Sequence, residues 1–273
     1  MCQIKMSIDF NRNRTQVLYE NILGLEPENL KQNKEMFKNH ILTIEESDLL
    51  SETIKEDAVD LFFNAALSFS EGIDSIYQRR FSWATVKLYY SVFYCLRASM
   101  ACKKTAIITN QSTYRLKINA GEKPFNTGNP KYKSTHKGTI NHYLDVFSGS
   151  DNLLTNLVDN KNVYQWYEDV REIINYREIC FEEPDYLSIW SVYDDALSNN
   201  ELTNLLTLLQ NDNNYLYCFQ EDYAVVAIPI KRMQQTVDDM NDSSLLQLFK
   251  SEKFDYLESV IKGQERQIKI WSS

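Results

Sequence analysis

The sequence predicts a mainly α-helical protein, in which a helical bundle is followed by a small extension that combines a β-hairpin with helices. The chain of 273 residues contains only 7 glycines and 5 prolines, too few for the many turns of an all-β fold. Apolar residues recur every three or four positions over long stretches, as they do along one face of an α-helix. The hydrophobic share of 43% and the charged share of 25% are typical of a folded domain and exclude a disordered chain.

Three segments follow from the patterning along the chain. Residues 1–50 are polar with short helical patches, and we expect an N-terminal extension there. Residues 51–197 carry the strongest helical periodicity and form the predicted bundle. Residues 198–273 form the predicted α+β extension, whose hairpin is expected from two short apolar runs, 215–219 and 223–228, joined by three polar residues.

Two long helices should open the bundle. The first is expected over 51–77, where acidic residues in the first turn suit the positive end of the helix dipole. The second is expected over 83–98 with Ser82 as its cap, and it should be the central helix because it is apolar on every side. An irregular segment over 103–134 separates these helices from the later ones. The later helices are expected at 135–147 with Ser134 or Thr135 as cap, 153–158, 164–177 ending near Pro184, 188–209 with a break at 198–200, 236–240 and 243–262.

The cysteines, the histidines and the hydropathy exclude several classes of protein. Five scattered cysteines without a CxxC pair predict free thiols in a reducing cytoplasm, with Cys95 in the core. The three histidines lack zinc-type spacing, so we expect no metal site and no cofactor. No apolar run approaches the roughly 20 residues of a membrane-spanning helix, and the first residues lack the apolar region of a secretory signal, so a cytoplasmic protein is expected.

Three motifs stand in a fixed order along the predicted bundle. The central helix reads Trp83-Ala84, Tyr89-Tyr90, Phe93-Tyr94 and Arg97-Ala98, then follow His136-Lys137-Gly138 and finally Arg171 with Tyr176 five positions later. Together these motifs resemble those of HEPN-type domains, which carry an aromatic helix ending in Arg-Ala, a His-Lys-Gly segment and an Arg followed a few positions later by a His. The resemblance covers about residues 52–190.

The resemblance implies an up-and-down helical bundle that forms a homodimer and, in active members, cleaves RNA without a metal. In that reaction the 2′-hydroxyl attacks the adjacent phosphate, a side chain transfers protons, and an arginine stabilises the developing charge. On this chain the implied catalytic residues are Arg171 for the charge and Tyr176 or His136 for the proton. Tyr176 stands where the family motif has its histidine, and a tyrosine with a pKa of about 10 is a poor base near neutral pH.

Two ways of completing the catalytic set stay open. Arg171 and Tyr176 lie roughly 140° apart around an ideal helix, so they converge only if the helix end unwinds or a second subunit contributes. Alternatively, His136 or His142 reaches the site from another helix, or Tyr176 serves only as an acid. An Arg171 that only pairs with Glu168 on a solvated helix face is the structural alternative, and the aromatic residues of the central helix are expected to pack in the core rather than to stack on bases.

The positive charge is concentrated in one part of an acidic chain. The net charge is −9, yet residues 97–143 contain nine basic residues and one acid, Glu122, a net +8, so the remaining residues carry −17. Basic residues interleaved with aromatic ones are typical of surfaces that bind single-stranded nucleic acid. The residues expected to bind nucleic acid are Arg115, Lys117, Lys131, Lys133 and Lys137. A basic loop that lies against the acidic body until a partner displaces it is the alternative.

Three functions are consistent with these patterns. The first is a component of a prokaryotic-type defence or toxin–antitoxin system that acts on RNA, either as a metal-independent endoribonuclease or as a degenerate RNA-binding relative. The second is a non-catalytic assembly subunit that dimerises and docks a larger effector, encoded nearby, through its C-terminal extension. The third is a nucleotide or small-molecule sensor that uses the turn around His136.

Overall fold

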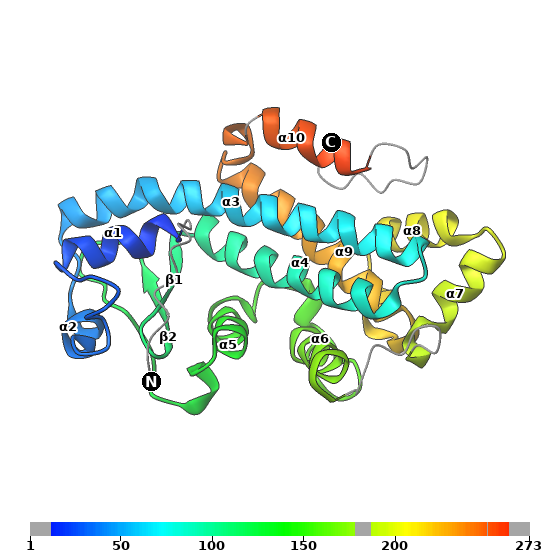
Figure 1. The fold of residues 1–273 in the computed structure, drawn as a ribbon, viewed down its shortest axis with the longest axis horizontal. Helices are drawn as coiled ribbons and strands as arrows, with labels where there is room; N and C mark the ends of the chain where they lie inside the picture. The colour runs from blue at the N-terminus through cyan, green and yellow to red at the C-terminus, as the bar shows by residue number, and fades with distance from the viewer. Residues whose placement is uncertain (1–11, 178–186, 250, 262–273) are drawn as a thin grey trace.

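The computed structural model describes residues 12–177, 187–249 and 251–261, and this part of the chain is mainly α-helical with one small antiparallel sheet. The mainly α fold is therefore confirmed (Figure 1). The helices are α1 Arg14–Ile22, α2 Lys34–Asn39, α3 Ile44–Tyr77, α4 Phe81–Cys102, α5 Thr135–Phe147, α6 Val163–Glu172, α7 Ser191–Ser198, α8 Leu202–Asn211, α9 Glu221–Asp242 and α10 Ser251–Ile261, and the strands are β1 Thr105–Thr109 and β2 Thr113–Lys117.

The two long helices α3 and α4 run side by side along the length of the molecule (Figure 1). α3 begins at Ile44 and not near residue 51, because Thr43 and Glu46 form a reciprocal capping box at its N-terminus. The predicted cap of α4 is also wrong, since Ser82 lies inside the helix and the N-cap is Arg80. Gly72 of α3 allows the two helices to approach closely, because a Cβ there would lie 2.7 Å from the side chain of Leu88.

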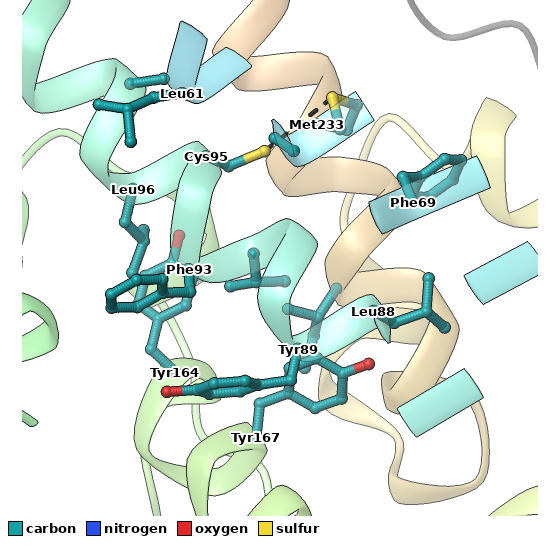
Figure 2. Packing of buried hydrophobic residues seen from close by; sticks show 14 of the residues in the cluster. Leu61, Phe69, Leu88, Tyr89, Phe93, Cys95, Leu96, Tyr164, Tyr167 and Met233 are labelled. Carbon is teal, nitrogen blue, oxygen red and sulfur yellow. Dashed lines mark hydrogen bonds between the residues drawn. The ribbon is translucent and has the colours of Figure 1, made fainter. Parts of the chain in front are cut away.

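α4 is the central helix, as its sequence predicts. It contacts α3 and α9 along its length, and α5 and α6 pack against it from a further side. In Figure 1 α5 and α6 are seen nearly end-on, so they cross α4 steeply and do not run up and down beside it. Cys95 is fully buried in this core, and Tyr89 and Phe93 are buried as well, so the predicted core positions of these three side chains are confirmed (Figure 2).

The predicted C-terminal hairpin is wrong. Residues 216–219 form a short 3-10 helix, and residues 221–242 form α9, which is buried along much of its length and lies parallel to α4. The parallel arrangement follows from two sulfur contacts that lie about two helical turns apart on each helix. Cys95 lies 3.9 Å from Met233 (Figure 2), and Cys102 lies 3.4 Å from Met240. The segment that was expected to form an extension thus contributes a helix to the same core.

Pro229 lies inside α9, where a proline ordinarily breaks the helix. Its missing N–H leaves the carbonyl of Val225, four positions earlier, without its helical donor. The buried hydroxyl of Tyr167 on α6 donates a hydrogen bond to that carbonyl at 2.8 Å. The helix therefore continues through the proline because α6 supplies the missing donor.

The hairpin that does form lies in the segment that was expected to be irregular. β1 and β2 pair antiparallel, with Ala106 opposite Leu116 and Ile108 opposite Tyr114. Gln111 adopts a left-handed conformation with φ of 61° in the turn between the strands. The hairpin packs against α1, α4 and α5, so it positions the N-terminus of α5 against the bundle.

The shorter elements follow the predictions in part. α5 begins after Ser134, whose side chain accepts a hydrogen bond from the Lys137 amide, so the predicted cap is confirmed. α7 and α8 are separated at residues 199–201, close to the expected break, whereas the helix predicted over 153–158 is reduced to one 3-10 turn, Asn152–Leu154. α10 covers only the second half of the helix predicted over 243–262, and the residues 236–240, predicted as a separate helix, belong to α9. The expected helix end near Pro184 lies outside the described residues.

A buried polar network centred on Arg232 ties four segments together. Its guanidinium, 2% exposed, donates to the hydroxyl of Tyr143 at 2.6 Å and to Ser99 at 2.8 Å, and lies 3.5 Å from the carboxylate of Asp151. The hydroxyl of Tyr164 also donates to Asp151. A charge so deeply buried requires such partners, and the network accordingly joins α9 to α4, α5 and α6.

Candidate functional site

One face of α4 presents aromatic side chains to α5 and α6. Tyr89, Tyr90 and Phe93 follow the three- and four-residue spacing that places side chains on one side of a helix. The imidazole of His136 lies among them, with its ring centroid 4.7 Å from Phe93, 5.6 Å from Tyr89 and 5.7 Å from Tyr90. The imidazole is therefore held between α4 and the first turn of α5.

His136 is fixed in its orientation by Tyr89. The hydroxyl of Tyr89 and Nδ1 of His136 share a hydrogen bond at 3.0 Å. Burial raises the pKa of Tyr89, so this hydroxyl keeps its proton at neutral pH. The other ring nitrogen of His136, Nε2, forms no hydrogen bond with a residue that the structure describes.

Arg171 meets His136 at the same tyrosine. The Arg171 side chain is 6% exposed, and its Cζ lies 5.2 Å from the ring centroid of Tyr89 and 5.9 Å from that of Tyr90. Arg97, one turn beyond Phe93 on α4, places its Cζ 5.8 Å from the centroid of the Phe93 ring. Two predicted catalytic residues, Arg171 and His136, are thus brought together, and Arg97 lies near them.

The electrostatics of this cluster keep His136 neutral. Burial, followed by repulsion from Arg171 and from Arg97, lowers the pKa of His136 from 6.5 to about 4. Burial also lowers the pKa of Arg97, whose Nε has no hydrogen-bond partner within the described ranges. The N-terminal amides of α5 add to the positive potential at this point. The arrangement is suited to an anion, whose charge would offset the repulsion among these groups.

Glu168 is a member of this cluster that the sequence did not reveal. It precedes Arg171 by one turn on α6, is 5% exposed, and its Oε1 has no hydrogen-bond partner among the described residues. Burial raises its pKa from 4.5 to about 7, with smaller contributions from neighbouring charges. A carboxyl group with such a pKa can exchange a proton near neutral pH. The only sequence signal was its spacing from Arg171, which is equally typical of a solvated ion pair.

Lys137 lies at the edge of the cluster. Its ammonium group is nearly half exposed and forms an ion pair with Glu172 of α6 at 3.1 Å. Gly138 follows, and its lack of a side chain is required, because a Cβ there would lie 2.6 Å from the hydroxyl oxygen of Thr113. The His-Lys-Gly segment therefore combines a ring directed at α4 with a close contact between α5 and the hairpin.

The remaining predicted catalytic residue, Tyr176, lies in a widened helical turn. α6 ends at Glu172, and the backbone of Ile173–Arg177 continues as a π-helix. Such turns change the angular spacing of side chains and recur at functional sites. The Tyr176 side chain lies outside what the structure describes.

His142 does not join the cluster. It is fully buried, its Nε2 lies 2.9 Å from the Thr113 carbonyl, and its ring stacks on Tyr132 with centroids 4.3 Å apart. Burial lowers its pKa. Of the two histidines considered for the site, His136 is therefore the one that lies beside Arg171.

The predicted nucleic-acid residues divide into two groups. Arg115 and Lys131 lie 3.8 Å and 3.4 Å from carboxylate oxygens of Asp145, and Lys137 pairs with Glu172 as described above. Lys117 and Lys133 are exposed and form no ion pair with any residue that the structure describes. Part of the basic segment is thus neutralised locally, and part of it faces solvent.

The described part of the chain has neither a metal-binding cluster nor a membrane-spanning helix. Residues 12–177, 187–249 and 251–261 contain no group of three or more histidine, cysteine, aspartate or glutamate side chains placed to hold a metal ion. Within these ranges every helix is too short or too polar to cross a lipid bilayer. Cys95, Cys102 and Cys218 are free thiols, and burial raises the pKa of the first two to about 11.

No protein-family model, curated protein or solved structure gave a significant match to this chain. The resemblance to HEPN-type domains stays a prediction from the three sequence motifs.

Proposed function

We propose that the chain is a HEPN-like component of a prokaryotic-type defence or toxin–antitoxin system that binds RNA through the cluster at the N-terminus of α5. The observation that carries the proposal is the meeting of Arg171 and His136 at Tyr89, whose ring contacts the guanidinium and whose hydroxyl shares a hydrogen bond with the imidazole. Arg171 has the planar fork that matches phosphate oxygens, and the start of α5 supplies further positive potential.

The same cluster supports a route to metal-independent cleavage. A phosphate bound between Arg97 and Arg171 would offset the repulsion that depresses the pKa of His136, so that the imidazole gains proton affinity when RNA is present. His136, with Nδ1–H donating to the Tyr89 hydroxyl oxygen, would then accept the proton of the attacking 2′-hydroxyl at Nε2, and Arg171 would stabilise the charge on the phosphate. As the cyclic phosphate forms, the bond to the 5′-oxygen would break, and protonated Glu168 would donate a proton to that leaving oxygen. Glu168, whose pKa is about 7, is the second group that can exchange a proton at this place.

A homodimer in a reducing cytoplasm is part of this proposal. The resemblance implies dimerisation, and a second subunit would place two such clusters around one cleft. The free thiols of Cys95, Cys102 and Cys218 suit a compartment in which disulfides do not form.

The test measures binding and cleavage separately. Binding of a fluorescent single-stranded RNA is followed by anisotropy, and cleavage is followed on gels in the presence of EDTA. Arg171→Ala should weaken binding at least tenfold, and Arg171→Lys should restore it only in part because lysine lacks the bidentate fork. Lys55→Ala is the matched control, since Lys55 is a cation on the exposed face of α3 that pairs with Glu52.

The outcomes separate the forms of the proposal. RNA cleavage that is lost in Arg171→Ala and in His136→Asn would support the endoribonuclease. Binding without cleavage would support the degenerate relative. Wild-type protein that does not bind RNA, or cleavage that survives Arg171→Ala, would overturn the proposed site. Thermal unfolding of each variant shows whether a loss reflects the site or the fold.

A further inference from the structure

Phe125 is an exposed aromatic residue that the backbone holds in place. Its side chain is 44% exposed. Its amide donates to the Arg115 carbonyl at 2.8 Å, and its carbonyl accepts from the Arg115 amide at 3.1 Å. The next residue, Asn126, donates from its side chain to the Thr113 carbonyl at 2.7 Å. The ring is thus fixed beside β2 by hydrogen bonds and not by its own burial.

Arg115 covers one face of this ring. Its Cζ lies 4.4 Å from the ring centroid, which is a close cation–π contact. Asp145 lies 3.8 Å from the same guanidinium and helps to hold it over the ring. Because the guanidinium occupies one face, the exposed area of Phe125 belongs to the edge and the opposite face of the ring. A flat group could stack there and extend the layer of guanidinium and phenyl.

The surroundings of Phe125 are positively charged. Lys117 lies two positions from Arg115 on the outward side of β2, and Lys123 precedes Phe125 by two residues. Lys133 is exposed at the end of the 3-10 turn Pro130–Tyr132, directly before α5. These three lysines have no ion-pair partner among the residues that the structure describes, so they can meet phosphates.

We propose that Phe125 is a stacking platform for an unpaired base, and that Lys117 and Lys123 contact the phosphates of the same single strand. β2 and the 3-10 turn both pack against α5, whose N-terminus carries the cluster of His136 and Arg171. Arg115, which covers Phe125, lies beside Asp145 in the last turn of α5, whereas His136 lies in its first turn, so a strand that stacks on Phe125 would have to run along α5 to reach that cluster. This inference rests on the proposed function and adds to it a preference for single strands, because a paired base has no free face.

The experiment compares a single-stranded RNA with a duplex of the same length, both fluorescently labelled, on the full chain. Phe125→Ala should weaken binding of the single strand roughly tenfold and binding of the duplex much less. Phe125→Trp should keep the affinity, since it keeps a flat ring, whereas Phe125→Leu should lose it although it stays apolar. Tyr256→Ala is the matched control, an aromatic residue on α10 that is 52% exposed.

Each outcome decides the inference. Stacking is supported if Phe125→Ala and Phe125→Leu lose affinity for the single strand and Phe125→Trp keeps it. An equal loss of affinity for the single strand and for the duplex overturns the stacking inference. Binding of an acidic peptide, poly-glutamate, with the same dependence on Phe125 also overturns it, because that result indicates an acidic protein partner. Unchanged RNA binding in Phe125→Ala together with a loss in Arg171→Ala removes only the stacking inference, whereas a wild-type chain that binds no RNA removes the proposed function with it.

Discussion

Replacing Glu168 with glutamine should stabilise the folded protein above neutral pH and change little in acid. The side chain is 5% exposed, and burial raises its pKa from 4.5 to about 7. A carboxyl group whose pKa is higher in the folded state binds its proton more tightly there than in the unfolded chain. The folded state therefore loses stability as the pH rises from the unfolded pKa to the folded one, and the loss is complete above the folded pKa.

The magnitude follows from the two pKa values of Glu168. A tenfold change in proton affinity corresponds to about 1.4 kcal/mol, so the rise from 4.5 to about 7 costs the folded state on the order of 3 kcal/mol above pH 7. Glutamine keeps the shape of the side chain and carries no charge. Glu168→Gln should thus gain on the order of 3 kcal/mol at about pH 8, roughly half of that near pH 6, and almost nothing near pH 4.

The assay is urea unfolding of wild type and Glu168→Gln, followed by circular dichroism at three pH values across this range. Asp169→Asn on the same helix is the control, because Asp169 is 39% exposed and pairs with Lys161 at the surface. Its effect should be small at every pH. If Glu168→Gln raises the free energy of unfolding equally in acid and in base, the packing of the amide is responsible. If it gives no increase in base, the buried carboxylate does not destabilise the fold, and the reasoning is refuted.

Two further substitutions test the contacts that hold the site in place. Tyr167→Phe should lower the free energy of unfolding by about 1–3 kcal/mol, because it leaves the buried Val225 carbonyl without a donor. In a Pro229→Ala background, where the helix supplies its own N–H, the loss should be less than about 1 kcal/mol. Equal losses in both backgrounds, measured by urea unfolding, would contradict this pairing. Gly138→Ala should cost about 1–3 kcal/mol because its Cβ would lie 2.6 Å from a β2 side chain. Gly149→Ala, where no atom lies within 4 Å of the added Cβ, is the control, and a similarly small change at both positions would refute the close contact.

The helices could be predicted where periodicity and capping agree. α4 and α5 lie close to where the sequence places them, because α4 is apolar on every side and Ser134 caps α5. The start of α3 was displaced because the capping box at Thr43 and Glu46 lies before the apolar periodicity begins. The beginning of α9 was assigned to strands because its valines and isoleucine favour β-structure locally, and burial between α4 and α6 overrides that preference.

The site could be predicted in its residue types but not in its geometry. Arg171 and His136 belong to motifs that are visible in the sequence, whereas their meeting at Tyr89 depends on how α5 and α6 cross α4. Glu168 was not predicted, because spacing alone does not distinguish a buried carboxyl group from a solvated one. The sequence alone places Phe125 only among the aromatic residues that interleave with the basic ones, and its fixed position follows from the pairing of its backbone with β2.

The same reasoning changes what the net charge of the chain means for nucleic-acid binding. A net charge of −9 suggests repulsion of phosphates everywhere, yet the acidic groups that face the basic segment pair with only some of its cations. Asp239 pairs with Lys103, Asp145 lies beside Arg115 and Lys131, and Glu172 pairs with Lys137. In the basic segment 97–143, the exposed cations that form no ion pair with a described residue are Lys104, Lys117, Lys123 and Lys133. Lys117 and Lys123 lie two residues from Arg115 and from Phe125, so unneutralised positive charge lies beside the proposed stacking residue. The acidic remainder of the surface would direct a strand towards it.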